Sequence, residues 1–508
     1  MEPEEDEKFV LEHIPEERQS AAQKAFRPRS FGSRLEMYRF VKDPSDLIGF
    51  EWVNKMHVAI WRDNGTLICL GGAGFEAYWD RKVDYIFEKA GVYHFEGSIY
   101  GKTDAAIAET ATWFWSLQRP GEDSILKTFV FDAREDQIFD FAALQPEQLA
   151  RILDSNPARR YSFTRGSWNT AQSIILASRP YPLKWKFTEN SFAFEDDGTA
   201  FVDTLVNRHS SFGSVHFDSD TDSMPLSREN FTRLLKFGTF DKLKLEYLDE
   251  EMILLPFAAK VHELNYTINA RDFQPEHLKS LNINTRKITM EISLTDMSDW
   301  KRIPVSFLNR FSEIGTFEKL DFIVECWDLR EPIDENKANS VAEAMISVIK
   351  ANRCLKHLGL NHSYFTFDWL PHLQSIFEAA GDHKCLHELI VPAYPEQEDP
   401  DFSWLKRLLS RNRSITVLDR RGDKITDGFS IDRLYALNRC YHGSAALMKE
   451  ESTSLRPQLV ATALQKNASE KFDHAALLLA NHLDVLSEFM HGADLEDVPC
   501  AGELQSEH

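Results

Sequence analysis

Two stretches of the sequence, GTFDKLKL at residues 238–245 and GTFEKLDF at residues 315–322, repeat almost the same eight letters. Five of the eight positions are identical, and only Lys244 against Asp321 reverses the chemistry. Each stretch places a leucine three residues after a phenylalanine. A repeated apolar phrase of this kind predicts two copies of one structural unit, with both side chains in equivalent core positions.

Similar units extend outward from these two stretches. Apolar runs typical of strands recur about every 29 residues, which is the range of solenoid repeats. They lie at residues 127–131, 161–163, 183–187, 215–217, 243–247, 264–268, 288–294, 320–324, 355–360, 386–391 and 415–418. Amphipathic helices are predicted between them, for example at 227–236, 341–349, 369–379 and 402–409. Stacking would let such units bury faces that a single unit cannot bury.

The later units carry a recognisable phrase. Residues 412–428, NRSITVLDRRGDKITDG, resemble the leucine-rich repeat with one spacer missing before Gly428. Residues 352–360 (NRCLKHLGL) and 384–391 (KCLHELIV) are similar. The pattern departs from the family where Ser363 and Asp423 replace the ladder asparagine and where Arg420 replaces a core leucine.

The resemblance implies an architecture. Helix-containing units of this length are similar to the ribonuclease-inhibitor-like subclass, which implies a right-handed α/β horseshoe with parallel concave strands and outer helices over residues 125–430. Residues 431–439 resemble the closing helix of such arrays, and further helical runs follow. We therefore expect a helical C-terminal cap over 431–490, because a solenoid end needs a cover for its core.

The remaining segments have a different character. Residues 1–34 are polar and predict a disordered tail, and residues 491–508 predict an acidic disordered tail. Residues 35–124 predict an α/β region. Within it, two strand-like runs flank Asp63-Asn64-Gly65 and predict a hairpin at 57–72, because Asn-Gly accepts the positive φ of a tight turn. A helix is expected at 105–117.

Composition narrows the functional classes. The chain has 508 residues, a net charge of −22 and a pI near 5.3, so nucleic-acid and anionic-membrane partners are disfavoured. Six single cysteines without a CxxC pair predict no zinc ribbon and a reducing compartment. The acidic N-terminus and the absence of a long apolar run predict an intracellular, cytoplasmic protein without a membrane span, with a nuclear location left open.

The sequence has only weak motifs for metal binding, phosphate binding or catalysis. Residues Asp218–Glu229 have carboxylates at EF-hand spacing, but Ser223 occupies the position where an EF-hand loop needs glycine for its sharp turn. We therefore favour an acidic loop before a Ser227-capped helix, and calcium binding stays an alternative. Leu70–Phe75 is glycine-rich without a phosphate-loop spacing, and the chain has no H-E-x-x-H or G-x-S-x-G. The sequence therefore assigns no catalytic, cofactor or metal residue, and a non-enzyme is expected.

Alternation along the predicted strands assigns a surface. If the apolar anchors point into the core, the residues between them face the concave side. The predicted partner-binding residues are Lys184, Lys186, His216, Lys242, Lys244, Glu246, Asn265, Glu291, Asp321, Glu325, His357, Asn361, Glu388, Asp419 and Arg421. Their order predicts a surface that is basic at its N-terminal end and acidic over the remainder.

Three functional hypotheses follow. The first is a protein-interaction scaffold or adaptor that binds another protein on the concave face. The second is an F-box-like substrate receptor of a ubiquitin ligase. The third is an enzyme with a site in 35–124, where Trp113, Phe114 and Trp115 form an aromatic cluster that serves either the core or an interface.

Overall fold

The computed structural model describes most of the chain. The described residues are 11–26, 29–30, 33–48, 50, 57–71, 75–76, 81–89, 92–118, 124–129, 137–163, 166–188, 192–218, 224–294, 300–326, 335–360, 367–449, 456–467 and 472–492. The chain divides into two compact units: unit 1 contains residues 1–303 and 324–328, and unit 2 contains residues 304–323 and 329–508.

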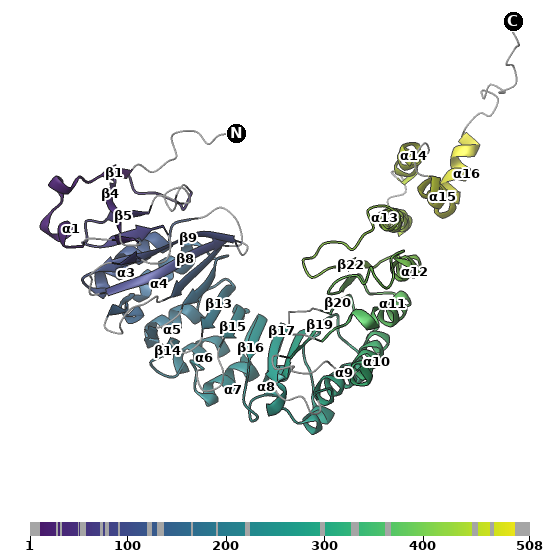
Figure 1. Ribbon diagram of the computed structural model, residues 1–508, viewed down its shortest axis with the longest axis horizontal. Coiled ribbons are helices and arrows are strands. Elements are labelled where there is room, and N and C mark those ends of the chain that lie inside the picture. Colours follow the sequence, from purple (N-terminus) through teal and green to yellow (C-terminus); the bar gives the residue numbers. More distant parts are fainter. Residues whose placement is uncertain are drawn as a thin grey trace, which may run out of the picture. The chain divides into compact units, whose positions relative to one another are not determined.

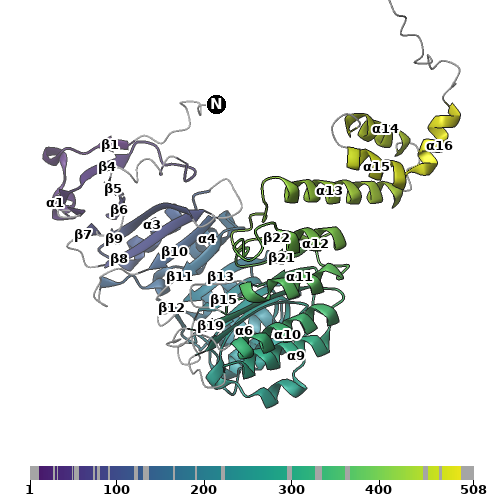
Figure 2. The ribbon, with the colours of Figure 1, turned by 45° about the vertical axis from the view of Figure 1, so that its right-hand side comes forward.

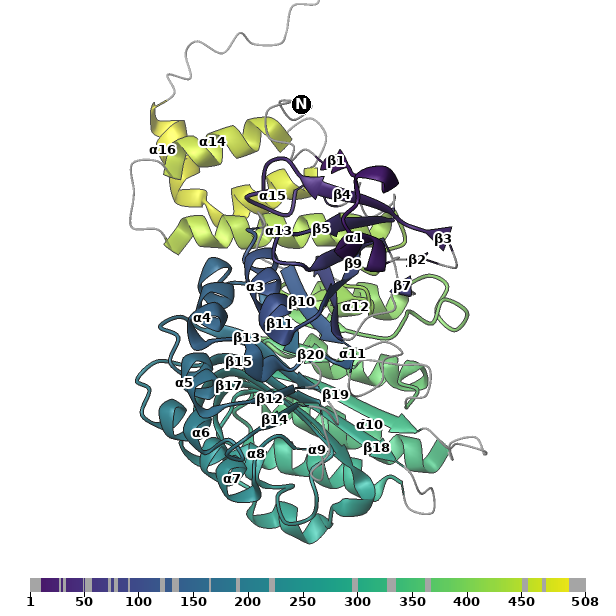
Figure 3. The same cartoon turned by 90° about the vertical axis from the view of Figure 1, so that its left-hand side faces the viewer.

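Seven parallel strands form the main part of unit 1. They are, in hydrogen-bonded order, β10 (Ser124–Phe129), β11 (Arg160–Phe163), β13 (Leu183–Thr188), β15 (Gly213–Asp218), β16 (Thr239–Glu246), β17 (Lys260–Asn269) and β18 (Lys287–Leu294). Helices α4 (Pro146–Ser155), α5 (Thr170–Ala177), α6 (Thr199–Val206) and α7 (Arg228–Phe237) follow successive strands and lie along one face of the sheet (Figures 1 and 3).

Shorter elements complete this region. They are η4 (Phe141–Ala143), the parallel pair β12 (Gly166–Trp168) and β14 (Phe192–Phe194), α8 (Leu255–Ala258), η5 (Ala270–Asp272) and η6 (Pro275–Ser280).

The core of unit 1 lies between the seven parallel strands and helices α4–α7. Every second side chain of β13 and β15 is buried, and the residues between them are half-exposed. Phe187 packs edge-on against Phe201 of α6, and Phe217 packs in the same way against Phe231 of α7. Because these strand residues point toward the helices, their neighbours along each strand must point to the opposite face.

Local signals set the helix starts. The Ser227 hydroxyl accepts the backbone amide of Asn230 at the start of α7, as the sequence predicted. Asn169 and Gln172 form a capping box at the start of α5. Such caps satisfy backbone amides that have no partner inside a helix.

The N-terminal part of unit 1 is mainly antiparallel. It contains η2 (Glu16–Arg18), β1 (Leu11–His13), β4 (Glu36–Phe40), β5 (Val58–Trp61), β6 (Leu67–Leu70), β8 (Arg81–Lys89), β9 (Val92–Gly101) and α3 (Asp104–Trp115), with β8 antiparallel to β10. The short strands β2 (Arg29–Ser30), β3 (Ser33–Arg34) and β7 (Phe75–Glu76) form a separate sheet. The hairpin predicted at 57–72 is present as β5 and β6, and Gly65 has the positive φ of +82° that its turn requires.

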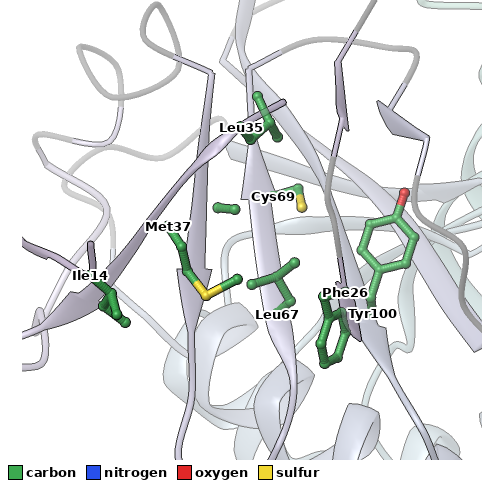
Figure 4. Packing of buried hydrophobic residues seen from close by; sticks show 8 residues of the cluster. Ile14, Phe26, Leu35, Met37, Leu67, Cys69 and Tyr100 are labelled. Atoms are coloured by element: carbon green, nitrogen blue, oxygen red, sulfur yellow. The ribbon is translucent and has the colours of Figure 1, made fainter. Parts of the chain in front are cut away.

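The structure differs from the expected disordered tail at residues 11–26. This segment forms β1, η2 and helix α1 (Ala21–Phe26). Ile14 and Phe26 enter a hydrophobic cluster with Leu35, Met37, Ala59, Leu67, Cys69 and Tyr100 (Figure 4). Phe26 is fully buried and meets Trp61 edge-on at a ring-centroid distance of 5.0 Å. A few apolar anchors therefore order a segment whose average composition is polar.

Unit 2 repeats the strand–helix alternation. Parallel strands β19 (Lys319–Cys326), β20 (His357–Gly359), β21 (Glu388–Ile390) and β22 (Thr416–Leu418) pair in chain order, and residues 324–326 of β19 fall in unit 1. Helices α10 (Glu335–Ala351), α11 (Leu373–Gly381) and α12 (Ser403–Arg411) lie side by side (Figure 2). Helix α9 (Arg302–Ile314) precedes β19, and η7 (Leu370–His372) precedes α11.

Four helices follow β22 among the residues that the structure describes. They are α13 (Ser430–Lys449), α14 (Arg456–Asn467), α15 (Phe472–Asn481) and α16 (Leu483–Gly492). Helices α15 and α16 are separated at His482, a buried residue next to the Ser444 hydroxyl. None of the helices in the described part of the chain has the length and apolar composition needed to cross a lipid bilayer.

Three polar side chains of unit 2 recur at nearly constant spacing: His383 and Asn412 are buried, and His442 is exposed. Asn412 donates to the carbonyls of Ala380, His383 and Leu386, and His383 contacts the carbonyl of Asn352 at 2.8 Å. His442 contacts the carbonyl of Arg413 at 3.0 Å. Each side chain thus joins its own repeat to the backbone of the preceding one.

The quoted stretches occupy equivalent positions. Phe240 and Leu243 are buried in unit 1, and Phe317 and Leu320 are buried in unit 2. Each of the eleven predicted strand positions coincides with a strand of the structure. The observed class is an α/β repeat-like architecture with a long, mostly parallel arrangement of strands.

Candidate interaction surface

The face of the unit 1 sheet opposite α4–α7 carries the side chains that lie between the core anchors. Hydrogen-bonded register aligns them into rows that cross the strands. The start row contains Arg160, Lys184, Ser214, Lys242, Glu263 and Lys287. The middle row, two residues further along each strand, contains Lys127, Ser162, Lys186, His216, Lys244, Asn265 and Thr289.

A third row lies at the ends of the same strands. This end row contains Thr188, Asp218, Glu246, Thr267 and Glu291. Its charged members are all acidic, whereas the charged members of the start and middle rows are mostly basic. The charge therefore changes sign along β16, from Lys242 to Glu246, and along β18, from Lys287 to Glu291.

Ion pairs connect the middle row to the end row. Lys186 pairs with Asp218, and the Lys244 ammonium lies 2.6 Å from the Glu246 carboxylate. His216 Nε2 lies 3.0 Å from the same carboxylate. The His216 hydrogen bond, together with Lys244, lowers the pKa of Glu246 to about 2 despite partial burial. Burial lowers the pKa of His216, so this imidazole is neutral at neutral pH.

The geometry of this network also invites a test for a metal site. Ligand atoms of His216, Asp218 and Glu246 lie within 4.8 Å of one another. Both carboxylates, however, already bind lysine ammonium groups, which a cation would have to displace. The donor set fits an ion-pair network better than a metal centre. Residues 219–223 of the proposed calcium loop lie outside the described residues.

A carboxyl pair and a strained tyrosine lie near the end row. Burial and the neighbouring Glu325 raise the pKa of Glu291 to about 7. Tyr247 follows β16 with a φ of +47°, unusual for a residue with a large side chain, and its hydroxyl bonds to Ser293. Burial raises the pKa of Tyr247, and Glu291 and Glu325 raise it further.

Unit 2 brings three of the predicted residues together. His357 on β20 contacts Asp321 of β19 at 2.9 Å and Glu388 of β21 at 2.8 Å. Burial opposes charging of the imidazole, but these two hydrogen bonds outweigh it and raise the pKa of His357. Gly359 permits the arrangement, because a Cβ there would lie 2.0 Å from the Asp321 carboxylate.

Two predicted surface residues are misplaced. Asp419 and Arg421 lie in the turn after β22, where the Asp419 carboxylate accepts the amides of Arg421 and Asp423. The buried anchor of β22 is Val417, so Thr416 and Leu418 occupy the alternate positions. The prediction for Asp419 and Arg421 was therefore wrong, because it offset the alternation of core and surface residues by one position. Asn361 lies outside the described residues.

The other predicted residues lie on strands. Lys184, Lys186, His216, Lys242, Lys244, Glu246, Asn265 and Glu291 belong to the rows of unit 1, and Glu325 is a nearly buried residue of β19. Sequence reasoning missed Lys127, Arg160, Glu263 and Lys287. The sequence could have identified them, because the alternation of core and surface residues continues past the apolar anchors toward the start of each strand.

A separate cleft of about 830 Å³ lies in unit 1 between β4, the β5–β6 turn, α3 and α4. Trp113 lines it, whereas Phe114 and Trp115 are buried in the core. The Arg62 guanidinium lies 4.0 Å from the centroid of the Trp113 ring and 2.5 Å from Asp43. The predicted aromatic cluster is thus divided between the core and the cleft.

The fold is an α/β repeat-like architecture in which the unit 1 sheet has helices α4–α7 on one face and the charged rows on the other. In comparisons with known proteins, the chain matches no protein-family model and no curated protein sequence.

Proposed function

We propose that the chain is a protein-interaction scaffold or adaptor of the leucine-rich-repeat type and that the face of the unit 1 sheet opposite α4–α7 binds the partner. The supporting observation is the alignment of charged, half-exposed side chains into rows opposite the helices. A solenoid of the ribonuclease-inhibitor-like subclass, closed by the C-terminal helices, accounts for the repeated strand–helix units and for the resemblance of residues 340–430.

The face has the properties of a specific binding surface. The side chains of Lys186, Lys242 and Lys244 are 29%, 42% and 37% exposed, so each is partly covered and partly accessible, with its ammonium group held by a carboxylate. Because these lysine side chains are already held in place, they lose less conformational entropy when they bind a partner. Alternating charge rows would also favour one docking orientation over others.

A steric test separates binding from stability. We expect Ser214→Trp and Thr289→Trp, made as independent single variants, each to reduce partner recovery at least about tenfold, because an indole would project from the centre of the face. Matched controls are Ala171→Trp and Glu229→Trp on the exposed surfaces of α5 and α7. Affinity purification of the full chain followed by mass spectrometry would measure recovery.

The controls determine the interpretation. All four variants should keep the melting temperature within a few degrees of the wild type. The proposal fails if the face variants recover the same partners as the controls, or if recovery falls only where folding is lost.

The cleft gives a specific reason to retain the enzyme alternative, because its volume lies in the range typical of small-molecule sites. Saturable binding of a small metabolite that Trp113→Ala abolishes would favour it.

The F-box-like receptor also remains an alternative. Co-purification of ligase core subunits with the intact chain would favour that function.

A further inference from the structure

We propose that Asp321, His357 and Glu388 form a proton-operated clamp on the sheet face of unit 2. With a protonated imidazole, the clamp joins β19, β20 and β21 through their side chains. When the proton leaves, the contact with Glu388 is lost and that carboxylate becomes solvated. This inference concerns unit 2 alone and goes beyond the proposed binding of a partner to unit 1.

The three side chains project from neighbouring strands on the same face of the sheet. Each strand has a fully buried leucine, namely Leu320, Leu358 or Leu389. Asp321, His357 and Glu388 are the sequence neighbours of these leucines, so their side chains point away from the core. Parallel register places His357 directly beside Glu388. The clamp therefore spans three consecutive strands.

Contacts at both ring nitrogens require a protonated imidazole. Nε2 of His357 lies 2.9 Å from the Asp321 carboxylate, and Nδ1 lies 2.8 Å from the Glu388 carboxylate. A neutral imidazole carries only one N–H, and a carboxylate oxygen can only accept a hydrogen bond. A neutral ring would therefore bring two lone pairs together at one of the contacts. The observed geometry fits an imidazolium that donates one N–H to each carboxylate.

The charged groups around His357 act in both directions. Burial favours the neutral ring, and the charge of Lys319 on β19 adds to this effect. The hydrogen bonds with Asp321 and Glu388, together with the charge of Asp321, outweigh both and raise the pKa of His357. The Lys319 ammonium also lies 3.3 Å from the Asp321 carboxylate. On the other side of the imidazole, β21 contributes Glu388.

Exposure determines which contact survives when the imidazolium loses a proton. The Asp321 side chain is 9% exposed, whereas the Glu388 side chain is 52% exposed. Water can replace the hydrogen bond of Glu388, but it has little access to Asp321, and a buried carboxylate that loses a donor is costly. The remaining proton should therefore stay on Nε2, facing Asp321, and the contact at Nδ1 should open.

The pH dependence of the clamp has a defined sign. The folded-state pKa of His357 lies above its ordinary value of 6.5, so the native state binds this proton more tightly than the unfolded chain does. The contribution of the clamp to stability is complete below pH 6.5 and is lost as pH rises through the folded-state pKa. Above that pKa, the Glu388 carboxylate has lost its cationic partner.

Nitrogen-15 NMR of the full-length chain with labelled histidine would test the clamp. Comparison with His357→Gln identifies the His357 signals. At pH 6, both ring nitrogens of His357 should have the chemical shift of a protonated nitrogen. On titration toward pH 9, Nδ1 should move to the shift of an unprotonated nitrogen while Nε2 stays protonated. The midpoint should lie above 6.5.

Two variants separate the clamp from a general effect of charge. Glu388→Gln removes a carboxylate that stabilises the imidazolium, so it should lower the titration midpoint of His357. The matched control is Glu343→Gln, which removes the same charge from an exposed position on α10. This control should leave the His357 midpoint unchanged.

Urea unfolding would measure the effect of the clamp on stability. The urea midpoint of the wild type should exceed that of His357→Gln at pH 6, and this difference should shrink by pH 9. His387→Gln, a change at an exposed neighbouring position, is the matched control. Its difference from the wild type should change less between the two pH values.

Three NMR results would each overturn the inference: a neutral His357 at pH 6, loss of the Nε2 proton before the Nδ1 proton, or a midpoint at or below 6.5. Equal His357 midpoints in Glu388→Gln and Glu343→Gln would also overturn it. None of these results bears on partner binding to unit 1, which the tryptophan variants test separately.

Discussion

Glu291 retains its proton to a higher pH than an exposed glutamate does. Burial is the main cause, and repulsion from Glu325 adds to it. The nearby network has the opposite effect on Glu246, whose hydrogen bonds stabilise its charged form. Two glutamates on the same face therefore differ in charge at neutral pH because one neighbours a histidine and a lysine and the other neighbours a carboxylate.

The shift at Glu291 predicts a pH-dependent stability difference. The folded-state pKa of about 7 exceeds the unfolded value near 4.5, so the native state binds more protons between these pH values. The residue's contribution to the free energy of unfolding therefore falls as pH rises through this window. Glu291→Gln, which mimics the protonated form, should be neutral at pH 5 and stabilising by about 1 kcal/mol at pH 8, after allowance for solvent screening.

Urea unfolding at the two pH values would measure this effect. Glu250→Gln, which changes an exposed glutamate, is the matched control and should show no such difference. A Glu291→Gln variant that is equally stable relative to wild type at both pH values would show that the carboxyl pair does not share a proton.

Repeated side-chain bonds join the elements of unit 2. Asn412 is nearly buried, and its amide group bonds to three carbonyls of the preceding repeat. Its side-chain oxygen also accepts the amide of Ser414. Removing the amide takes a donor from all three carbonyls, although Ala380 O keeps the backbone amide of His383, and incompletely satisfied buried acceptors cost more than the net value of one hydrogen bond.

We therefore expect Asn412→Ala to lower the free energy of unfolding by about 2–3 kcal/mol. The control Asn284→Ala removes an exposed amide that bonds to the single carbonyl of Ala258, and it should cost less than about 1 kcal/mol. Denaturant unfolding would compare them. Equal losses would mean that the buried bonds do not hold adjacent repeats together.

The sequence predicted elements better than it predicted side-chain positions. Long apolar periodicity located the parallel strands, and Ser227 and Asn64-Gly65 located a helix start and a turn. The position of Asp419 was wrong because β22 is only three residues long, too short for alternation to define its phase. Residues 11–26 were missed because Ile14 and Phe26 are isolated anchors whose partners lie on distant strands.

The charged rows depend on the whole sheet of unit 1. No single strand encodes them, because a row is formed only when register brings one position from each strand into line. A shift of one residue in any strand would exchange its core and surface faces. The binding proposal therefore depends on the strand register.

Cysteine pairing would test this register most directly. Asn265 and Thr289 are register partners on β17 and β18, with an expected Cα separation of about 4.8 Å. Glu291, the next same-face residue of β18, is about 8 Å from Asn265 by the same geometry, beyond the usual reach of a disulfide. Peptide mapping after mild oxidation should find a disulfide in Asn265→Cys/Thr289→Cys and little in Asn265→Cys/Glu291→Cys. The reverse result would contradict the aligned rows and the binding surface built from them.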